Sequence, residues 1–200
     1  MVEHSPGLTR SLDSTKEGLM HSLDKNQQLE EILAQESVEI HISGGTTLIS
    51  TVDLLMVLSI ENQWRIDKHG YAARSIPFTK GQPHGQRLHN FITGLDYVDH
   101  INGDTLDNRR ENLRPATHQQ NMWNRKLATN NTTGFKGVYR TPAGTFTAQI
   151  CKDGHIYRLG TSPTAEAAGH AYDDAAVELF GEFAALNFPR EGYRCIRDVA

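Results

Sequence analysis

The chain has 200 residues, 38% of them hydrophobic and 22% charged, with a formal net charge of −4, as in soluble globular proteins of one or two domains. It lacks the long apolar run of a membrane span and the pattern of a secretory signal, which favours a cytoplasmic location. The only cysteines, Cys151 and Cys195, are far apart, which argues against a thiolate zinc site and a disulfide framework.

The N-terminal residues 1–37 are polar and acidic. A few leucine and isoleucine residues allow one weak amphipathic helix over 24–36. We favour a loosely ordered extension instead, because little apolar surface is available for burial.

Regular structure is predicted to begin at Val38, where VEIHI and TLIS flank a Gly-Gly pair suited to a β-hairpin turn. The apolar segment VDLLMVLSI favours a short helix, and QWRI and YAARSI favour two short strands around the turn DKHG. The glycine- and proline-containing residues 79–86 predict a loop, and RLHNFITG predicts one or two helical turns.

Residues 98–126 carry the densest set of polar side chains with chemical potential. Their pattern predicts a strand, a turn-rich loop, a second short strand and a helix. Thr117 with Gln120 three residues later has the spacing of a capping box at the start of that helix. This order of elements is expected to bring Asp99 and Asn121 towards each other.

After a polar connector at 127–133, three strand segments precede a helix. GFKGVYR and TFTAQICK are joined by the turn TPAG, and HIYRLGTS follows the Asp153-Gly154 turn. Thr164 is the predicted N-cap of an alanine-rich helix that ends at Gly181. Small side chains on one face would let this helix lie close to the sheet.

The net charge hides an uneven distribution along the chain. Residues 109–158 contain nine basic and two acidic residues, whereas residues 1–60 contain three and nine. A charged stretch is often only a solvated face, but this imbalance favours a surface that binds phosphate groups.

The polar residues of 98–126 suit phosphodiester hydrolysis. A divalent cation bound by Asp99 and Asn121 would neutralise charge at the phosphate. His100 is the natural general base, and Asn112 would accept a hydrogen bond from its second ring nitrogen. Two arginines are candidates to hold the flanking phosphates: Arg109 and Arg110.

The residue types alone leave other interpretations open. Asp, Asn and Gly also build ordinary loops, and a single histidine is more often structural than catalytic. A calcium-binding EF-hand loop is excluded, because Ile101 occupies a position that needs an oxygen ligand.

Linked segments within 38–126 carry a family resemblance: W-R…G-Y-A, LHNFITG, VDHINGD, LDNRRENLR and AT-x-x-QN-x-x-N. Together they resemble the histidine–asparagine–histidine (HNH) homing endonucleases of the ββα-metal fold. The resemblance implies Asp99 and Asn121 as metal ligands, His100 as general base and Asn112 as its orienting partner. Departures from the pattern are Asn121 in place of the third histidine and Asn90 in place of a basic residue. His89 is either an accessory site residue or a packed helical histidine.

The segments GFKGVYR, AGTFTAQI, YRLGT, TAEAAGHAYDDAA and ALNFP, over 134–189, resemble the APETALA-two/ethylene-response-factor DNA-binding domain. In that family the three-stranded sheet lies in the major groove. Ala143 and Arg158 mark sites where the family's tryptophans and arginines are replaced, so base specificity does not carry over. The resemblance implies DNA contacts at matching or neighbouring positions: Lys136, Tyr139, Arg140, Lys152 and Arg158.

The predicted fold class is α+β, a ββα-metal nuclease core followed by a three-stranded antiparallel sheet packed on one helix. The predicted divisions of the chain are the extension 1–37, the nuclease domain 38–126, the linker 127–133, the DNA-binding domain 134–189 and the tail 190–200.

The predicted function is hydrolysis of double-stranded DNA with one divalent metal ion, Mg²⁺ by preference. No small-molecule cofactor or membrane partner is expected, and the sequence leaves a monomer and a dimer open. The alternative is a non-catalytic DNA-binding or regulatory protein that retains a degenerate nuclease fold.

Overall fold

The computed structural model describes residues 27–60, 64–77 and 85–196. Within these ranges no helix has the length and apolar character needed to cross a bilayer. The expectations for residues 1–26 and for most of the predicted loop 79–86 fall outside the described residues. Gly85 and Gln86, placed in that loop, belong instead to a short strand.

The first unit of the structure, residues 27–126, opens with a helical stretch at 27–33. Ile32 packs against the core, so this part of the expected loose extension is ordered. Strands β1 (Ser37–Ile42) and β2 (Gly45–Ser50) then form the predicted antiparallel hairpin. Gly44 turns the chain with a φ of 96°, a conformation that favours glycine.

The predicted short helix is also present. A 3₁₀ turn, η1 (Thr51–Asp53), leads into α2 (Leu54–Leu58). A small sheet follows, with β3 (Arg65–Ile66), β4 (Ala72–Ser75) and β5 (Gly85–Arg87) in that order.

Helix α3 (Leu88–Thr93) matches the predicted helical turns and ends at Gly94, which adopts the left-handed conformation. Leu88 from α3 is fully buried, as is Ile49 from β2, and both belong to the core of the first unit. The burial of such aliphatic side chains, each contributing about 2–3 kcal/mol, holds α3 against the hairpin.

The strand, loop, strand and helix predicted over 98–126 are confirmed. β6 (Val98–His100) pairs antiparallel with β8 (Leu113–Pro115), and α4 (His118–Trp123) follows. Thr117 and Gln120 form the predicted capping box. Between β6 and β8 lie β7 (Asp107–Asn108), which pairs parallel with β2, and the 3₁₀ turn η2 (Arg110–Asn112).

The second unit, residues 134–196, contains the predicted antiparallel sheet in the order β11-β10-β9. Its strands are β9 (Val138–Arg140), β10 (Phe146–Lys152) and β11 (His155–Ser162), and helix α5 (Ala165–Phe180) packs on one face. Gly169 lets α5 lie close to Phe135 and Phe188, because a Cβ at that position would lie 3.0 Å from the rings of both.

The C-terminal segment is built into the second unit. After η3 (Gly181–Phe183), strand β12 (Ala185–Leu186) pairs parallel with β13 (Arg194–Cys195). Cys195 is buried, and the amide of Ile196 donates to the carbonyl of Leu186 at 2.8 Å. Residues 190–196, expected to be a tail, are therefore fixed by burial and backbone pairing.

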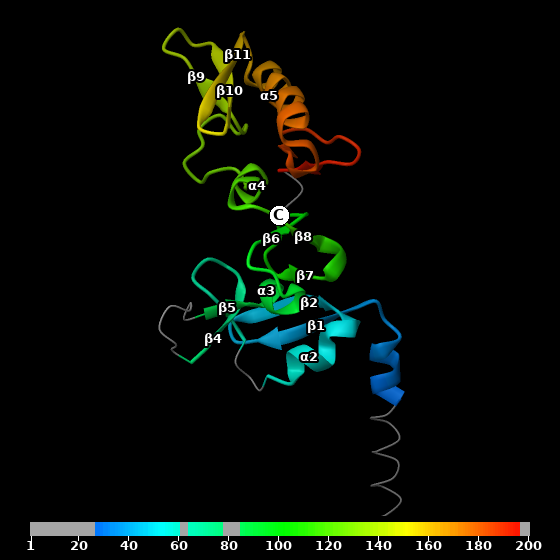
Figure 1. Ribbon diagram of the computed structural model, residues 1–200. Helices are drawn as coiled ribbons and strands as arrows, with labels where there is room; N and C mark the ends of the chain where they lie inside the picture. Colours follow the sequence, from blue (N-terminus) through cyan, green and yellow to red (C-terminus); the bar gives the residue numbers. More distant parts are fainter. Residues whose placement is uncertain (1–26, 61–63, 78–84, 197–200) are drawn as a thin grey trace, which may run out of the picture.

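The two units contact each other through α4 and β8, which lie between the N-terminal hairpin and the C-terminal sheet in Figure 1. Trp123 stacks on Phe180 with ring centroids 4.4 Å apart. Arg114 donates to the carbonyl of Glu182 at 2.8 Å and lies 3.8 Å over the ring of Phe183. These contacts attach the second unit directly to α4, which carries Asn121, and to β8, whose Arg114 pairs with Asp99 of β6.

Candidate active site

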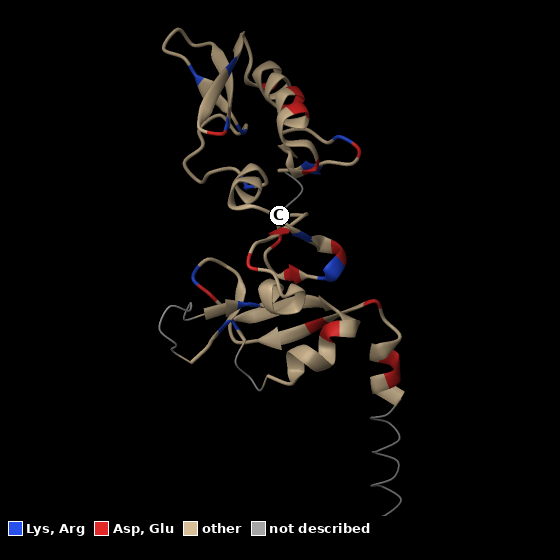
Figure 2. Cartoon of the chain, in the orientation of Figure 1, with Lys and Arg blue, Asp and Glu red and all other residues tan. Residues whose placement is uncertain are grey.

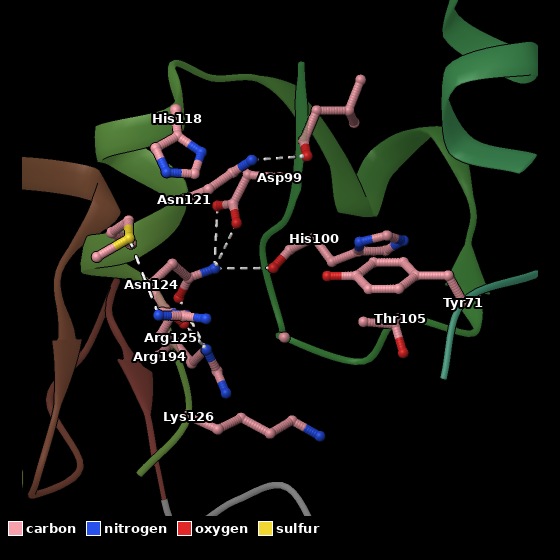
Figure 3. Close-up of a pocket in the computed structure, with 13 residues that line it drawn as sticks. Tyr71, Asp99, His100, Thr105, His118, Asn121, Asn124, Arg125, Lys126 and Arg194 are labelled. Atoms are coloured by element: carbon pink, nitrogen blue, oxygen red, sulfur yellow. Dashed lines mark hydrogen bonds between the residues drawn. The ribbon is translucent and has the colours of Figure 1, made fainter. Parts of the chain in front are cut away.

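A pocket of about 270 Å³ lies between β6, α4 and the C-terminal segment. Figure 3 shows side chains from all three around it. The structure thus brings together Asp99, His100 and Asn121, as the sequence predicted, and adds basic groups to the same wall. The basic side chains that line the pocket are Arg125, Lys126 and Arg194.

Asp99 is a buried carboxylate whose charge is balanced within the first unit. Arg114, its neighbour across the β6–β8 pair, donates Nε and Nη2 to Oδ2 at 2.9 and 2.7 Å. Asn124 donates Nδ2 to both carboxylate oxygens, at 3.1 and 2.9 Å. These bonds hold Asp99 in one orientation at the pocket and compensate for its burial.

Asn121 lines the pocket and has a side-chain oxygen that accepts no hydrogen bond from the described residues. Its Nδ2 donates to the carbonyl of Val98 at 3.2 Å, which fixes the amide plane. Its Oδ1 is buried, and no hydrogen-bond partner for it exists among the described residues. A buried acceptor without a donor is unfavourable unless another group satisfies it.

A hard divalent cation would supply that missing partner, because such ions prefer carboxylate and amide oxygens. Asp99 and Asn121 therefore fit a divalent ion. Within the described ranges, no cluster of three or more His, Cys, Asp or Glu residues forms a protein-only cage. An ion here would need further oxygens from water or from a bound phosphate.

The ring of His100 is held by Asn108, a residue that was not among those predicted from the sequence. Nε2 lies 3.3 Å from Oδ1 of Asn108, whose Nδ2 donates to Oγ1 of Thr47 at 2.8 Å. Thr47 in turn donates to the carbonyl of Leu106. In this chain of bonds the Asn108 oxygen accepts from Nε2–H, which leaves Nδ1 of the neutral ring as the free base.

Asn112, predicted to accept a hydrogen bond from His100, has a different place. Its Oδ1 accepts from the amide of Asn102 at 2.9 Å, and its Nδ2 donates to the carbonyl of Asp107 at 2.8 Å. These bonds engage both polar groups of the Asn112 side chain, so the predicted contact between Asn112 and the His100 ring is wrong. Asn112 braces the loop between β6 and β8, and Asn108 takes the position beside the histidine.

His89 lies behind His100, with its ring at 90° and a centroid distance of 4.8 Å. His89 is 3% exposed, and its Nδ1 has no hydrogen-bond partner among the residues that the structure describes. Burial, with help from the nearby His100 and Arg87, lowers the pKa of His89 to about 3. Among the two alternatives for His89, this packing supports a structural histidine.

Burial also lowers the pKa of His100 below 6.5, and it outweighs the opposing effects of the Asn108 hydrogen bond and Asp99. His100 is therefore neutral near pH 7. A neutral imidazole with a free Nδ1 is able to accept a proton from water.

Acid is expected to unfold this protein partly through His89. The folded-state pKa of about 3 lies below the reference value of 6.5, so the unfolded chain binds the proton more tightly. The stability that comes from keeping His89 neutral in the folded state is complete above pH 6.5 and is lost as the pH falls. The free energy of unfolding is expected to decrease by about 2 kcal/mol between pH 7 and pH 5 for this reason. Urea unfolding of wild type and His89→Leu at both pH values measures it, and equal pH dependence in the two would contradict it.

Arg109 and Arg110, predicted to hold phosphates, are paired with carboxylates of the chain itself. Arg109 donates two bonds to Asp107 at 2.8 Å and also contacts Glu111. Arg110 donates to Asp53 at 2.6–3.1 Å, which anchors η2 on η1 at the start of α2. These two arginines thus serve the loop that supports the pocket, and neither lines it.

The basic residues predicted for DNA contact in the second unit separate into two groups. Lys136 donates Nζ to the carbonyls of Trp123 and Arg125, at 2.5 and 3.0 Å, and burial lowers its pKa to about 7. Lys152 donates to the carbonyl of Leu179 at the end of α5. Both lysines therefore stabilise the unit and its junction with α4, which corrects their assignment to a DNA-facing surface.

The other predicted contacts, Tyr139, Arg140 and Arg158, are exposed on the sheet. The register aligns Tyr139 with Thr147 and Gln149 with Arg158. Figure 2 shows acidic residues on α5 and basic residues on the sheet. A nucleic acid would therefore meet less repulsion at the sheet than at the helix.

A family model described as HNH endonuclease matches residues 97–123, the stretch from the start of β6 to α4. An uncharacterized HNH endonuclease of Acanthamoeba polyphaga mimivirus is 34% identical over 152 residues, covering 72% of this chain and 75% of that protein. Dehydration-responsive element-binding protein 2A of Arabidopsis thaliana is 43% identical over 63 residues, 30% of this chain and 19% of that protein. Protein 3.8 of Escherichia phage T7 is 45% identical over 42 residues, 21% of this chain and 35% of that protein.

Proposed function

The chain belongs to the HNH endonuclease family, and we propose that it hydrolyses phosphodiester bonds of double-stranded DNA with a divalent metal ion. The observation that carries the proposal is the convergence of Asp99, His100 and Asn121 on one pocket. Partial similarity to transcription factors of the AP2/ERF group supports DNA as the substrate.

His100 is the proposed general base. Its Nε2–H is engaged by Asn108, so the ring keeps one tautomer and directs Nδ1 as the proton acceptor. The lowered pKa keeps the imidazole unprotonated near neutral pH. Tyr71, whose ring centroid lies 6.0 Å from that of His100, packs against the ring and limits its reorientation.

Asp99 and Asn121 are the residues that would hold the metal ion. When bound, a divalent ion such as Mg²⁺ would stabilise negative charge on the phosphate oxygens and on the leaving oxygen. Arg114 and Asn124 keep the Asp99 carboxylate fixed at the pocket, and the carbonyl of Val98 keeps the Asn121 amide in place. Arg125 and Lys126 on the pocket wall would attract the charged DNA backbone.

The second unit is the proposed DNA-binding module, with Tyr139, Arg140 and Arg158 on its sheet as the contact residues. Binding through this unit would raise the effective concentration of DNA at the pocket. One candidate active site in the described part of the chain suits a homing-type enzyme that nicks one strand as a monomer, and a dimer would be needed for simultaneous cutting of both strands.

Supercoiled plasmid incubated with the purified full chain is expected to become nicked or linear in Mg²⁺ and to stay supercoiled in excess EDTA. Gel electrophoresis with mapping of the cut ends measures the outcome. Binding of plasmid without cleavage in Mg²⁺, Mn²⁺ and other divalent ions would contradict the proposal. That result would favour the alternative, a non-catalytic DNA-binding protein with a degenerate nuclease fold.

A further inference from the structure

Arg194 reaches the nuclease pocket from the far end of the chain. Its backbone is fixed by the β12–β13 pair, where Ala185 is its register partner, and by the buried Cys195 beside it. Its side chain crosses to the first unit and lines the same pocket as Asp99 and His100. Arg194 therefore completes the pocket by contacting Asn124 of the first unit, which lies 70 positions earlier in the chain.

Specific contacts orient the Arg194 guanidinium. Nη1 donates to both the main-chain carbonyl and Oδ1 of Asn124, the latter at 2.9 Å. Gly103 makes room for the group, since a Cβ at that position would lie 2.2 Å from Cζ of Arg194. Two hydrogen bonds thus fix Nη1, and Gly103 adds no side chain beside the guanidinium. The group is therefore already oriented for a ligand at its other nitrogens.

Two of the Arg194 nitrogens lack acceptors. Nε and Nη2 are buried, and no partner for either exists in the part of the chain that the structure describes. Unsatisfied donors of a buried cation are costly, and an anion that accepts from both removes the cost. Nε and Nη2 together present the forked donor pair that matches a phosphate or a carboxylate.

The charge around Arg194 also favours an anion. Arg125 and Lys126 line the pocket with it, whereas the carboxylate there, Asp99, is already paired with Arg114 at 2.7 Å. The pocket thus holds positive charge that the described residues do not balance. A carboxylate of the protein does not fill this role, because Arg194 appears in no ion pair of the described chain.

We propose that Arg194 binds a phosphate oxygen of the DNA strand in the nuclease pocket, so that the C-terminal segment of the second unit completes the cleavage site. This inference rests on the proposed DNA endonuclease function. The pocket would then bind DNA productively only when the C-terminal segment is docked on the first unit. The matched family segment, residues 97–123, would be insufficient for full activity by itself.

The experiment compares Arg194→Ala with Arg190→Ala in the full chain. Arg190 is a matched control from the same segment, because its exposed side chain pairs with Asp174 and does not line the pocket. Single-turnover plasmid cleavage in Mg²⁺ is expected to slow roughly tenfold to a hundredfold in Arg194→Ala, the effect of one lost charge-assisted bond pair. Arg190→Ala is expected to stay within about twofold of wild type, as usual for an exposed ion pair.

A second measurement separates a phosphate contact from a structural role. DNA affinity is measured against salt concentration in the His100→Ala background, where cleavage does not interfere. Loss of one phosphate contact reduces the slope of log K against log salt by about 0.9. Arg194→Ala is expected to show this change, and Arg190→Ala to keep the parent slope. Arg194→Gln, which retains a donor for Asn124, provides the comparison if the alanine variant unfolds at a lower temperature.

The outcomes are distinct. Slower cleavage with an unchanged salt slope would overturn the phosphate contact and leave Arg194 as a brace for Asn124. Unchanged cleavage and slope would also overturn it, with the proposed function intact. If wild type binds DNA but does not cut it, the proposed function fails while the slopes still decide the Arg194 contact. Absence of DNA binding would overturn both.

Discussion

His100→Ala is expected to lower the plasmid cleavage rate by roughly a thousandfold, within the range for loss of a general base. The imidazole is the basic group whose free Nδ1, neutral state and placement in the pocket suit proton abstraction from water. The measurement is single-turnover cleavage of supercoiled plasmid in Mg²⁺ at pH 7.5, with thermal unfolding recorded to verify that the variant is folded.

His41→Ala is the matched control for that loss, since His41 is exposed on β1 and does not line the pocket. Its cleavage rate is expected to equal that of wild type. A His100→Ala protein that is folded and cuts at a rate near the wild-type one would remove His100 from the mechanism. Because the pKa of His100 is lowered by burial, wild-type activity is expected to persist below pH 6.5 before it falls.

Asn121→Ala is expected to reduce cleavage at least a hundredfold at low Mg²⁺ and to raise the Mg²⁺ concentration for half-maximal rate. The substitution removes the buried Oδ1 that has no hydrogen-bond partner in the described structure. Loss of one oxygen ligand from a site with few protein ligands weakens the hold on a divalent ion. Asn121→Asp keeps an oxygen and adds a negative charge but loses the donor to the Val98 carbonyl, so it is expected to bind Mg²⁺ more tightly than Asn121→Ala.

Metal binding supplies a readout that does not depend on catalysis. Mn²⁺ binding measured by electron paramagnetic resonance is expected to weaken in Asn121→Ala and to remain unchanged in Gln119→Ala. Gln119 lies on the same helix, but its side chain reaches Asp153 at 2.8 Å and does not line the pocket. Equal Mn²⁺ affinity in the two variants would contradict Asn121 as a ligand.

Several features of this protein were predictable from the sequence because they depend on near neighbours. The Gly-Gly pair determines the β1–β2 turn, Gly94 the end of α3, and Thr117 with Gln120 the start of α4. The turns between the segments of β9 to β11 and the small residues of α5 likewise favour a sheet packed on one helix. The same short-range order places Asp99 and Asn121 in one pocket, because β8 runs back along β6 and α4 then brings Asn121 next to Asp99.

The hydrogen-bond partners of the polar residues were decided by tertiary structure. Asn108, and not Asn112, holds His100 because β7 pairs with β2, which places Asn108 beside Thr47, 61 residues away. Arg110 likewise binds Asp53, 57 residues earlier in the chain, because folding packs η2 beside η1.

The position of the second unit had equally large effects. Its docking on α4 directs Lys136 towards backbone carbonyls and brings Arg194 to the pocket. Local sequence specifies turns, caps and the faces of elements, because those depend on residues within one or two turns of chain. Which charged side chain satisfies which buried group depends on how distant elements pack, and in this protein that packing determines the composition of the candidate active site.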